Sequence, residues 1–132
     1  MTDEITFTLP FAMPSLNVAF RTHWAKRAKD TGALRLQIMA AIGGPRHFPA
    51  EPWRRAHVTI ERRGRRLLDA DNLAGSCKSI VDCLCVQSRT HPTGLGIVVD
   101  DRPELMTMEF RQAVSRPQQT VVTIRNLEPK NV

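Results

Sequence analysis

The amino-acid sequence predicts a single α+β domain over residues 1–132, in which two main helices pack on a mixed β-sheet. A length of 132 residues suits one domain with one hydrophobic core. Hydrophobic residues make up 42% of the chain and charged residues 24%, which is the balance of an ordinary globular protein. The apolar patterns follow the order strand, helix, strand, helix and then three short strands, and this order favours an α+β architecture.

The first half of the chain is predicted to form a strand, a long helix and a second strand. Residues 5–9 alternate apolar side chains with threonine, which is typical of a strand. Residues 24–42 carry apolar side chains at helical spacing, and the Gly-Gly-Pro of 43–45 ends this helix. After a loop at 47–52, residues 56–61 alternate again and form the second predicted strand.

The second half is predicted to form one helix and three short strands. Residues 62–66, Arg-Arg-Gly-Arg-Arg, are interpreted as a turn. A helix is expected over about 77–86, with Ser76 as its N-cap. The remaining elements are expected in this order: a loop at 87–96, a short buried strand at 97–99, a strand at 105–111, a turn at 115–118 and a strand at 120–125.

The charge of the chain indicates an affinity for polyanions. Nineteen Lys and Arg against 13 Asp and Glu give a net charge of +6, and a basic surface attracts nucleic acid by counterion release. Many small basic proteins bind no nucleic acid, so the distribution of charge matters more than its sum. The arginine-rich run 62–66 leads directly to Asp69 and Asp71. A cationic approach beside an anionic pocket suits a phosphate ester that must meet metal-bound carboxylates.

A cytoplasmic location without membrane contact is expected. The N-terminus carries Asp3 and Glu4 and lacks the apolar region of a signal peptide. No apolar stretch approaches the roughly 20 residues that a bilayer span requires. The three cysteines, Cys77, Cys83 and Cys85, are an odd number, which fits a reducing compartment better than a disulfide framework.

The motif Asp69-x-Asp71-Asn72 is the strongest candidate for chemistry. In an extended segment, residues two apart point to the same side, so both carboxylates can converge on one hard cation. Mg²⁺ takes oxygen ligands and commonly binds a few carboxylates plus water. The alternative is turn or helix-cap chemistry, for which the same residues are well suited.

Two further motifs carry charged groups. Asp100 and Asp101 follow the apolar run 97–99, and their mutual repulsion calls for a metal, a basic partner or solvent; the alternative is a solvated turn. Lys78 and Asp82 share a helical face at i,i+4 and could form a simple surface ion pair. In a functional interpretation, Lys78 orients the attacking water or stabilises charge on the phosphate, while Asp82 holds that lysine or completes the metal shell.

Other kinds of site are weaker. Cys83-x-Cys85 with His91 suggests zinc, but a fourth ligand at the usual spacing is absent, and cysteines on a helix are ordinarily core residues. No Ser-His-Asp order, glycine-rich phosphate loop or dinucleotide fingerprint is present, so no organic cofactor is expected.

Taken in order, the motifs resemble the RusA-type Holliday junction resolvases, endodeoxyribonucleases of phage and prophage origin. The matching segments are Leu9-Pro10, Pro14-Ser15-Leu16-Asn17, Arg65-Arg66, Asp69-Ala70-Asp71-Asn72-Leu73, Lys78-Ser79-Ile80-Val81-Asp82-Cys83-Leu84 and Gly96-Ile97-Val98-Val99-Asp100-Asp101. Ordered motifs over most of the chain are far more specific than any one of them.

The resemblance implies a RusA-like fold and a homodimer that resolves four-way DNA junctions in recombination and repair, with Mg²⁺ as cofactor and Mn²⁺ as a substitute. By position, the catalytic residues would be Asp69, Asp71, Asp101 and Lys78. The residues expected to bind the metal are Asp69, Asp71, Asp82, Asp100 and Asp101. The residues expected to contact DNA are Asn17, Arg21, Arg62, Arg63, Arg65, Arg66 and Asn72.

One departure from the family pattern concerns Lys78. Ala74-Gly75-Ser76 lengthens the gap between Asp71 and Lys78. If the helix begins early, these seven residues make close to two turns and Lys78 faces the metal. If Ser76 is the N-cap, Lys78 lies in the first turn. The loop 87–96 is also long, which would alter how Asp100 and Asp101 are presented.

Two alternatives remain open. The first is a DNA-binding protein without catalytic activity, suggested by the displaced lysine. The second is a structural or interaction protein whose acidic residues only cap turns. A functional metal site predicts that carboxyl oxygens of Asp69, Asp71 and Asp101 lie within reach of one cation.

Overall fold

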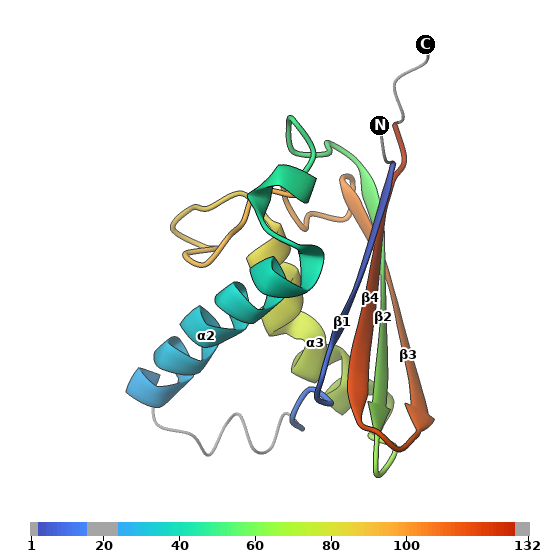
Figure 1. Ribbon diagram of the computed structural model, residues 1–132. Coiled ribbons are helices and arrows are strands. Elements are labelled where there is room, and N and C mark those ends of the chain that lie inside the picture. Colours follow the sequence, from blue (N-terminus) through green and yellow to red (C-terminus); the bar gives the residue numbers. More distant parts are fainter. Residues whose placement is uncertain (1–2, 16–23, 129–132) are drawn as a thin grey trace.

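The computed structural model describes residues 3–15 and 24–128, with the backbone alone for 24–31. It confirms the predicted class: the chain forms one small α+β domain with a mixed four-stranded sheet and two helices (Figure 1). The elements are β1 (Glu4–Leu9), α2 (Trp24–Ile42), the 3-10 helix η1 (Pro45–His47), β2 (Ala56–Gly64), α3 (Ala70–Leu84), β3 (Met106–Val114) and β4 (Gln119–Asn126).

The sheet has the strand order β1-β4-β2-β3. β4 pairs antiparallel with both β1 and β2, whereas β2 and β3 run parallel. A parallel pair needs a crossover connection, and the chain between β2 and β3 supplies it as α3 and the long segment that follows. This crossover carries most of the charged motifs, so the sheet topology itself holds them beside one another.

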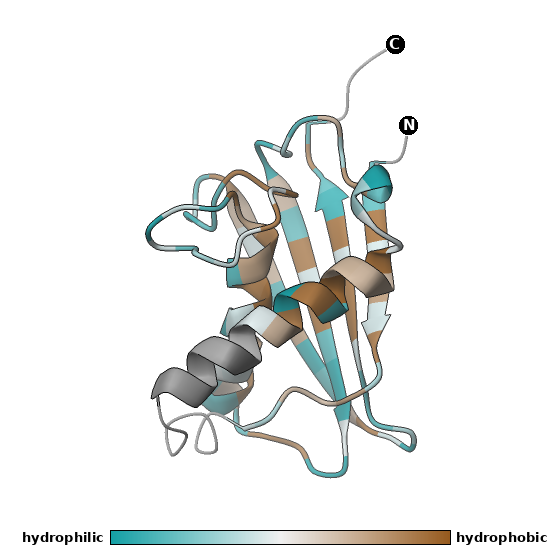
Figure 2. Ribbon diagram, turned by 60° about the vertical axis from the view of Figure 1, so that its left-hand side comes forward, coloured by the Kyte–Doolittle hydropathy of each residue, from teal (hydrophilic) through white to brown (hydrophobic). Residues whose placement is uncertain are grey.

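Both helices cover the same face of the sheet (Figure 1). Hydrophobic and hydrophilic residues alternate along the strands (Figure 2), because successive side chains of a strand point to opposite faces. Residues such as Phe7, Ile60 and Ile124 are buried against the helices, which contribute Ile38 and Ile80. Burying each side chain of this size stabilises the fold by about 1.5–3 kcal/mol.

Three predicted boundaries were wrong. β2 continues through Gly64, so the predicted turn at 62–66 is a strand for its first three residues. α3 begins at Ala70 rather than near Cys77, because Asp69 is the N-cap and its carboxylate accepts a hydrogen bond from the Asn72 N–H at 2.9 Å. Ser76 lies inside that helix, where its hydroxyl donates to the Leu73 carbonyl at 2.9 Å.

The predicted strand at 97–99 does not join the sheet. Val98 instead makes isolated parallel bridges to Trp53 and to Cys85. Ile97 and Val98 are nevertheless buried, as their apolar character predicted. The other predicted strands and the helix 24–42 are confirmed within a few residues, as is the loop 87–96. Among the described helices, none is both long and apolar enough to cross a bilayer.

Candidate metal centre and active site

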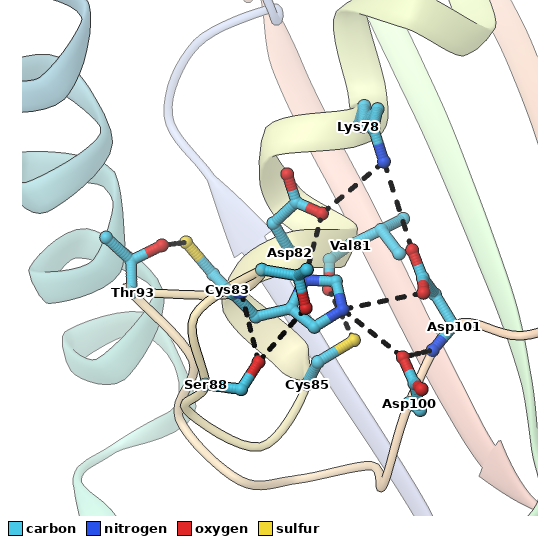
Figure 3. A network of polar contacts seen from close by, with 11 residues as sticks. Lys78, Val81, Asp82, Cys83, Cys85, Ser88, Thr93, Asp100 and Asp101 are labelled. Atoms are coloured by element: carbon cyan, nitrogen blue, oxygen red, sulfur yellow. Dashed lines mark hydrogen bonds and ion pairs between the residues drawn. The ribbon is translucent and has the colours of Figure 1, made fainter.

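Three consecutive parts of the crossover meet at one place (Figure 3). The second half of α3 supplies Lys78 and Asp82, and its C-cap residue is Cys85. The loop that follows supplies His91. The segment after Val98 then supplies Asp101, which points toward Lys78 of α3, and Asp100, which faces His91.

Backbone hydrogen bonds hold the returning chain against the end of α3. The N–H groups of Ile97 and Val98 both donate to the Leu84 carbonyl at 3.0 Å, and the Gly96 N–H donates to the Cys85 carbonyl at 3.0 Å. Gly94 has no room for a side chain, since a Cβ there would lie 2.3 Å from the Cys85 oxygen. The close return explains how residues fifteen or more positions apart come into contact.

His91 lies at the centre of this group. Its Nε2 is 3.2 Å from Asp100 Oδ1 and 3.5 Å from Asp101 Oδ1, and its Nδ1 is 3.3 Å from Asp82 Oδ1. The histidine side chain is only 9% exposed. Its Nδ1 is buried and, despite the nearby carboxylate, makes no aligned hydrogen bond. Three carboxylates thus surround one buried imidazole ring.

Two exposed cations touch the outside of the group. Lys78 Nζ lies 3.6 Å from Asp82 Oδ1 and 3.9 Å from Asp101 Oδ2, with 66% of the lysine side chain exposed. Arg102 Nε lies 3.1 Å from Asp100 Oδ2 and is also exposed. Because solvent screens exposed pairs, these contacts compensate the carboxylates only in part.

The surroundings shift the pKa of two groups in opposite directions. The Asp101 backbone N–H, and then the hydrogen bond from His91 and the charge of Arg102, lower the pKa of the Asp100 carboxyl. Burial is the main reason that the pKa of the Cys85 thiol is raised, to about 12. The carboxylates of Asp101, Asp100 and Asp82 raise it further, while Lys78 opposes them.

Within the described residues, one group of potential metal ligands stands close together. Donor atoms of Cys85, His91, Asp100 and Asp101 all lie within 4.8 Å of one another. Sulfur, imidazole nitrogen and two carboxylates form a mixed donor set. Such a set suits a divalent transition-metal ion better than a hard ion that prefers oxygen alone.

The predicted site residues divide between two places. Asp101, Asp100, Asp82 and Lys78 belong to the group just described. Asp69 and Asp71 are exposed at the start of α3 and do not lie within that 4.8 Å spacing in the described structure. The expected convergence of all three aspartates is therefore absent, because Asp69 and Asp71 belong to the helix start rather than to an extended segment.

The early start of α3 decides the position of Lys78. Asp71, Lys78 and Asp82 are separated by seven and four residues, so they share one face of the helix. The helix does begin early, and Lys78 Nζ lies 3.9 Å from Asp101 Oδ2, while its orientation toward a metal stays a prediction.

The arginines expected to contact DNA differ in exposure. The prediction that Arg62 contacts DNA was wrong, because this side chain lies on the core-facing side of β2 with 9% of its surface exposed. Its guanidinium donates to the carbonyls of Met13 at 2.7 Å and Arg66 at 2.9 Å, so its role is structural.

The other expected DNA contacts remain at or near the surface. Arg63 is half-buried and pairs with Glu61 at 2.6 Å, whereas Arg65 and Arg66 are exposed. Asn72 is half-buried at the start of α3. The remaining two, Asn17 and Arg21, lie outside the described residues.

His91 and Cys85 were undervalued by sequence reasoning. A zinc site was set aside because no fourth ligand follows at the usual spacing, yet Asp100 and Asp101 complete the group from the returning segment. Cys83, the other half of the cysteine pair, lies outside it and contacts the Thr93 hydroxyl at 3.4 Å. The sequence feature that could have indicated this group is His91, which lies in the loop that leads to Asp100 and Asp101.

In comparisons with known proteins, no protein-family model and no curated protein matches this chain.

Proposed function

We propose that this protein is a Mg²⁺-dependent endodeoxyribonuclease that resolves four-way DNA junctions, with Mn²⁺ as a substitute ion. The observation that supports it most is the meeting of Asp82, Asp101 and Lys78 on one side of α3. In phosphodiester hydrolysis, carboxylates hold the cation and a basic group stabilises charge on the phosphate. The order of motifs shared with RusA-type resolvases is the second support.

In this proposal Asp101 and Asp82 offer oxygens to the ion, with Asp100 behind them. A divalent ion bound there would supply an activated water and neutralise charge on the scissile phosphate. Lys78 is the substrate-facing partner: with 66% of its side chain exposed, its ammonium can leave Asp82 and donate to a phosphate oxygen.

Asp69 and Asp71 stay in the proposal as acidic residues at the substrate-facing end of α3. Asp71 lies two turns before Lys78 on the same helix face, about 10 Å along the axis. In this conformation neither Asp69 nor Asp71 belongs to the group of donor atoms that contains Asp101. Asp69 and Asp71 would act on a second ion or after a rearrangement that DNA induces.

The basic surface supplies the approach for DNA. The net charge of +6 favours a polyanion, and Arg65 and Arg66 are exposed immediately before the start of α3. A four-way junction has twofold symmetry, and a homodimer would present one site to each of two strands.

The experiment compares cleavage of a labelled four-way junction, a Y-fork and a linear duplex by the whole chain with Mg²⁺ or Mn²⁺. The junction should be cut much faster than the other two. Asp101→Asn should lower the rate by at least about 100-fold, since partners that only orient metal ligands already matter 10- to 100-fold. Asp3→Asn, an exposed aspartate at the start of β1, is the matched control and should cut normally.

Two outcomes would contradict the proposal. No cleavage of the junction with either ion would remove the activity altogether. Equal cleavage of all three substrates would remove the junction selectivity and leave a general nuclease.

A second candidate is a junction-binding protein without catalysis. The separation of Asp69 and Asp71 from Asp101 favours it, because the acidic set implied by the resemblance is not assembled. Tight junction binding without cleavage, unchanged by Asp71→Asn, would support this candidate.

A further inference from the structure

We infer that Cys85, His91, Asp100 and Asp101 form a binding site for a divalent transition-metal ion of the Zn²⁺ and Co²⁺ class. This goes beyond the proposed function, which needs Mg²⁺ or Mn²⁺. The site shares Asp100 and Asp101 with the proposed Mg²⁺ site, but the inference concerns ion binding alone and is tested without DNA.

The donor set points to this class of ion. Mg²⁺ takes oxygen ligands in an octahedral arrangement and keeps several waters. Zn²⁺ takes cysteine sulfur, histidine nitrogen and carboxylate oxygen, and most often has four ligands in a tetrahedron. Cys85 and His91 supply the two donor types that Mg²⁺ avoids, and the two aspartates bring the set to four.

The distances also fit. Ligands that share a tetrahedral ion at bonds of about 2.0–2.3 Å lie roughly 3.3–3.8 Å from one another. His91 Nε2 already lies 3.2 Å from Asp100 Oδ1 and 3.5 Å from Asp101 Oδ1. All four donors fall within 4.8 Å, so small side-chain movements of about an ångström close the site.

The buried histidine is the independent observation. The His91 side chain is only 9% exposed, and its Nδ1 has no aligned hydrogen bond. An ion on Nε2, which faces Asp100 and Asp101, would fix the ring tautomer that carries its proton on Nδ1, the atom whose hydrogen-bonding capacity is unsatisfied. A ligating histidine usually donates its other ring N–H to a carboxylate, and Asp82 Oδ1 lies 3.3 Å from this Nδ1.

Charge supports a cation at the same place. Asp82, Asp100 and Asp101 surround the ring, while the nearby cations Lys78 and Arg102 are exposed. Binding would replace the thiol proton of Cys85, now directed at the Val81 carbonyl at 3.4 Å, and release that proton to solvent. His91 would ligate through a proton-free Nε2 and keep its ring proton on Nδ1, facing Asp82, and any further ring proton would also go to solvent. The ion would join the end of α3, the loop 87–96 and the segment after Val98.

The test uses Co²⁺ as a spectroscopic probe on the whole chain after removal of metals with a chelator. Co²⁺ should bind as a single ion per chain and give a thiolate-to-cobalt charge-transfer band in the near ultraviolet. Zn²⁺ should abolish the band by displacement, whereas a large excess of Mg²⁺ should leave it unchanged. Zn²⁺ should also raise the melting temperature.

Two cysteine variants make a matched pair. Cys85→Ser should remove the band and weaken Co²⁺ binding by about 100-fold or more. Cys83→Ser should leave both unchanged, because Cys83 is equally buried and two residues away but contacts only Thr93 within this region. Circular dichroism checks that each variant is folded.

Three results would overturn the inference. They are the absence of a thiolate band in the unaltered chain, displacement of Co²⁺ by Mg²⁺, and a band retained by folded Cys85→Ser but lost in Cys83→Ser. The first needs no variant, so a Cys85→Ser chain that fails to fold does not remove the test. Junction cleavage is measured separately with Mg²⁺ or Mn²⁺, so failure of the inference and failure of the proposed function remain distinguishable.

Discussion

Aspartates lie at both ends of helix α3, but the helix dipole acts on their charges in opposite ways. At its start, Asp69 accepts a backbone hydrogen bond and Asp71 lies in the first turn, where the positive end of the helix dipole favours negative charge. At its end, Asp82, Asp100 and Asp101 gather near the negative end of the same dipole. The helix dipole therefore favours the charge of the first pair and opposes that of the second group, which lies beside His91 and the cations Lys78 and Arg102.

This comparison explains why short acidic motifs are ambiguous. Asp69-Ala70-Asp71 was the stronger metal motif by sequence, and the structure gives it a capping role. Asp100-Asp101 was the weaker motif, and it lies 3.2–3.5 Å from a buried histidine. The position of a carboxylate relative to a helix end thus says more about the groups that surround it than its spacing in the sequence does.

Removing the buried ring should have the largest effect on stability. His91→Ala leaves three carboxylates without their central partner and opens a cavity, so we expect a loss of about 2–3 kcal/mol in the free energy of unfolding. Urea denaturation in the presence of a chelator measures it. His47→Ala, in exposed η1, is the control and should lie within about 0.5 kcal/mol of the unaltered chain. Equal losses in both variants would mean that His91 stabilises the fold no more than an exposed histidine does.

Alkaline pH should weaken the same end of α3. Burial raises the pKa of Cys85 from 9.0 to about 12, so between these values the unfolded chain releases its thiol proton while the folded chain keeps it. Stability is unaffected below pH 9 and should fall above it by up to about 1.4 kcal/mol per pH unit for this thiol. Burial also raises the pKa values of Cys77 and Cys83, which adds to the slope.

Urea denaturation from pH 8 to pH 11 measures this slope. Cys85→Ala should reduce it, since one titrating thiol is then absent from both states. An identical slope in that variant would show that Cys85 does not hold its proton more tightly in the folded state.

Removing the N-cap of α3 should cost less stability than removing His91. Asp69→Ala removes the acceptor of the Asn72 N–H and should cost about 1 kcal/mol. Asp69→Asn keeps the hydrogen bond and should cost only a fraction of this amount. Thermal unfolding measures the difference in stability between the two variants, and this difference separates capping from metal binding. A rise in stability for Asp69→Ala would show that the surrounding charges disfavour the Asp69 carboxylate.

The smallest effect is expected for Asp100. The Asp101 N–H, His91 and Arg102 lower the pKa of this carboxyl below 3.8, so the stability that it contributes is present above about pH 4 and is lost as the pH falls through the folded value. Asp100→Asn should cost about 0.5 kcal/mol at pH 6, since the side chain is partly exposed. This difference should shrink as the pH falls below about 4.

Much of the fold could be predicted because its strands and α2 carry clear periodic patterns. The alternation on β1, β2 and β4 places every second residue in the core, and Gly43 ends α2 with a positive φ of 101°. The errors lie where local signals compete. Arg62 and Arg63 suggested a turn, but β2 continues because the Arg62 guanidinium finds backbone carbonyls inside the protein.

The candidate site could be predicted only in part, since it depends on a long-range return of the chain. Lys78 and Asp82 follow from helical spacing, and their contact is present at 3.6 Å. The approach of His91 and Asp101 to that pair depends on the path of the loop 87–96, which no local pattern specifies. Asp69 failed as a partner of Asp101 because a good N-cap starts the helix seven residues earlier than expected.

The sheet order has a consequence for how the protein is made. β1 pairs only with β4, and β4 also pairs with β2, so the strand nearest the end of the chain lies between two strands that are translated much earlier. While residues 119–126 are still in the ribosomal exit tunnel, β1 has no neighbouring strand in the sheet. β2 lacks its antiparallel partner β4 at the same stage. Folding of this domain is therefore delayed until residues 119–126 have left the tunnel, and the nascent chain exposes aggregation-prone strands to chaperones and proteases until then.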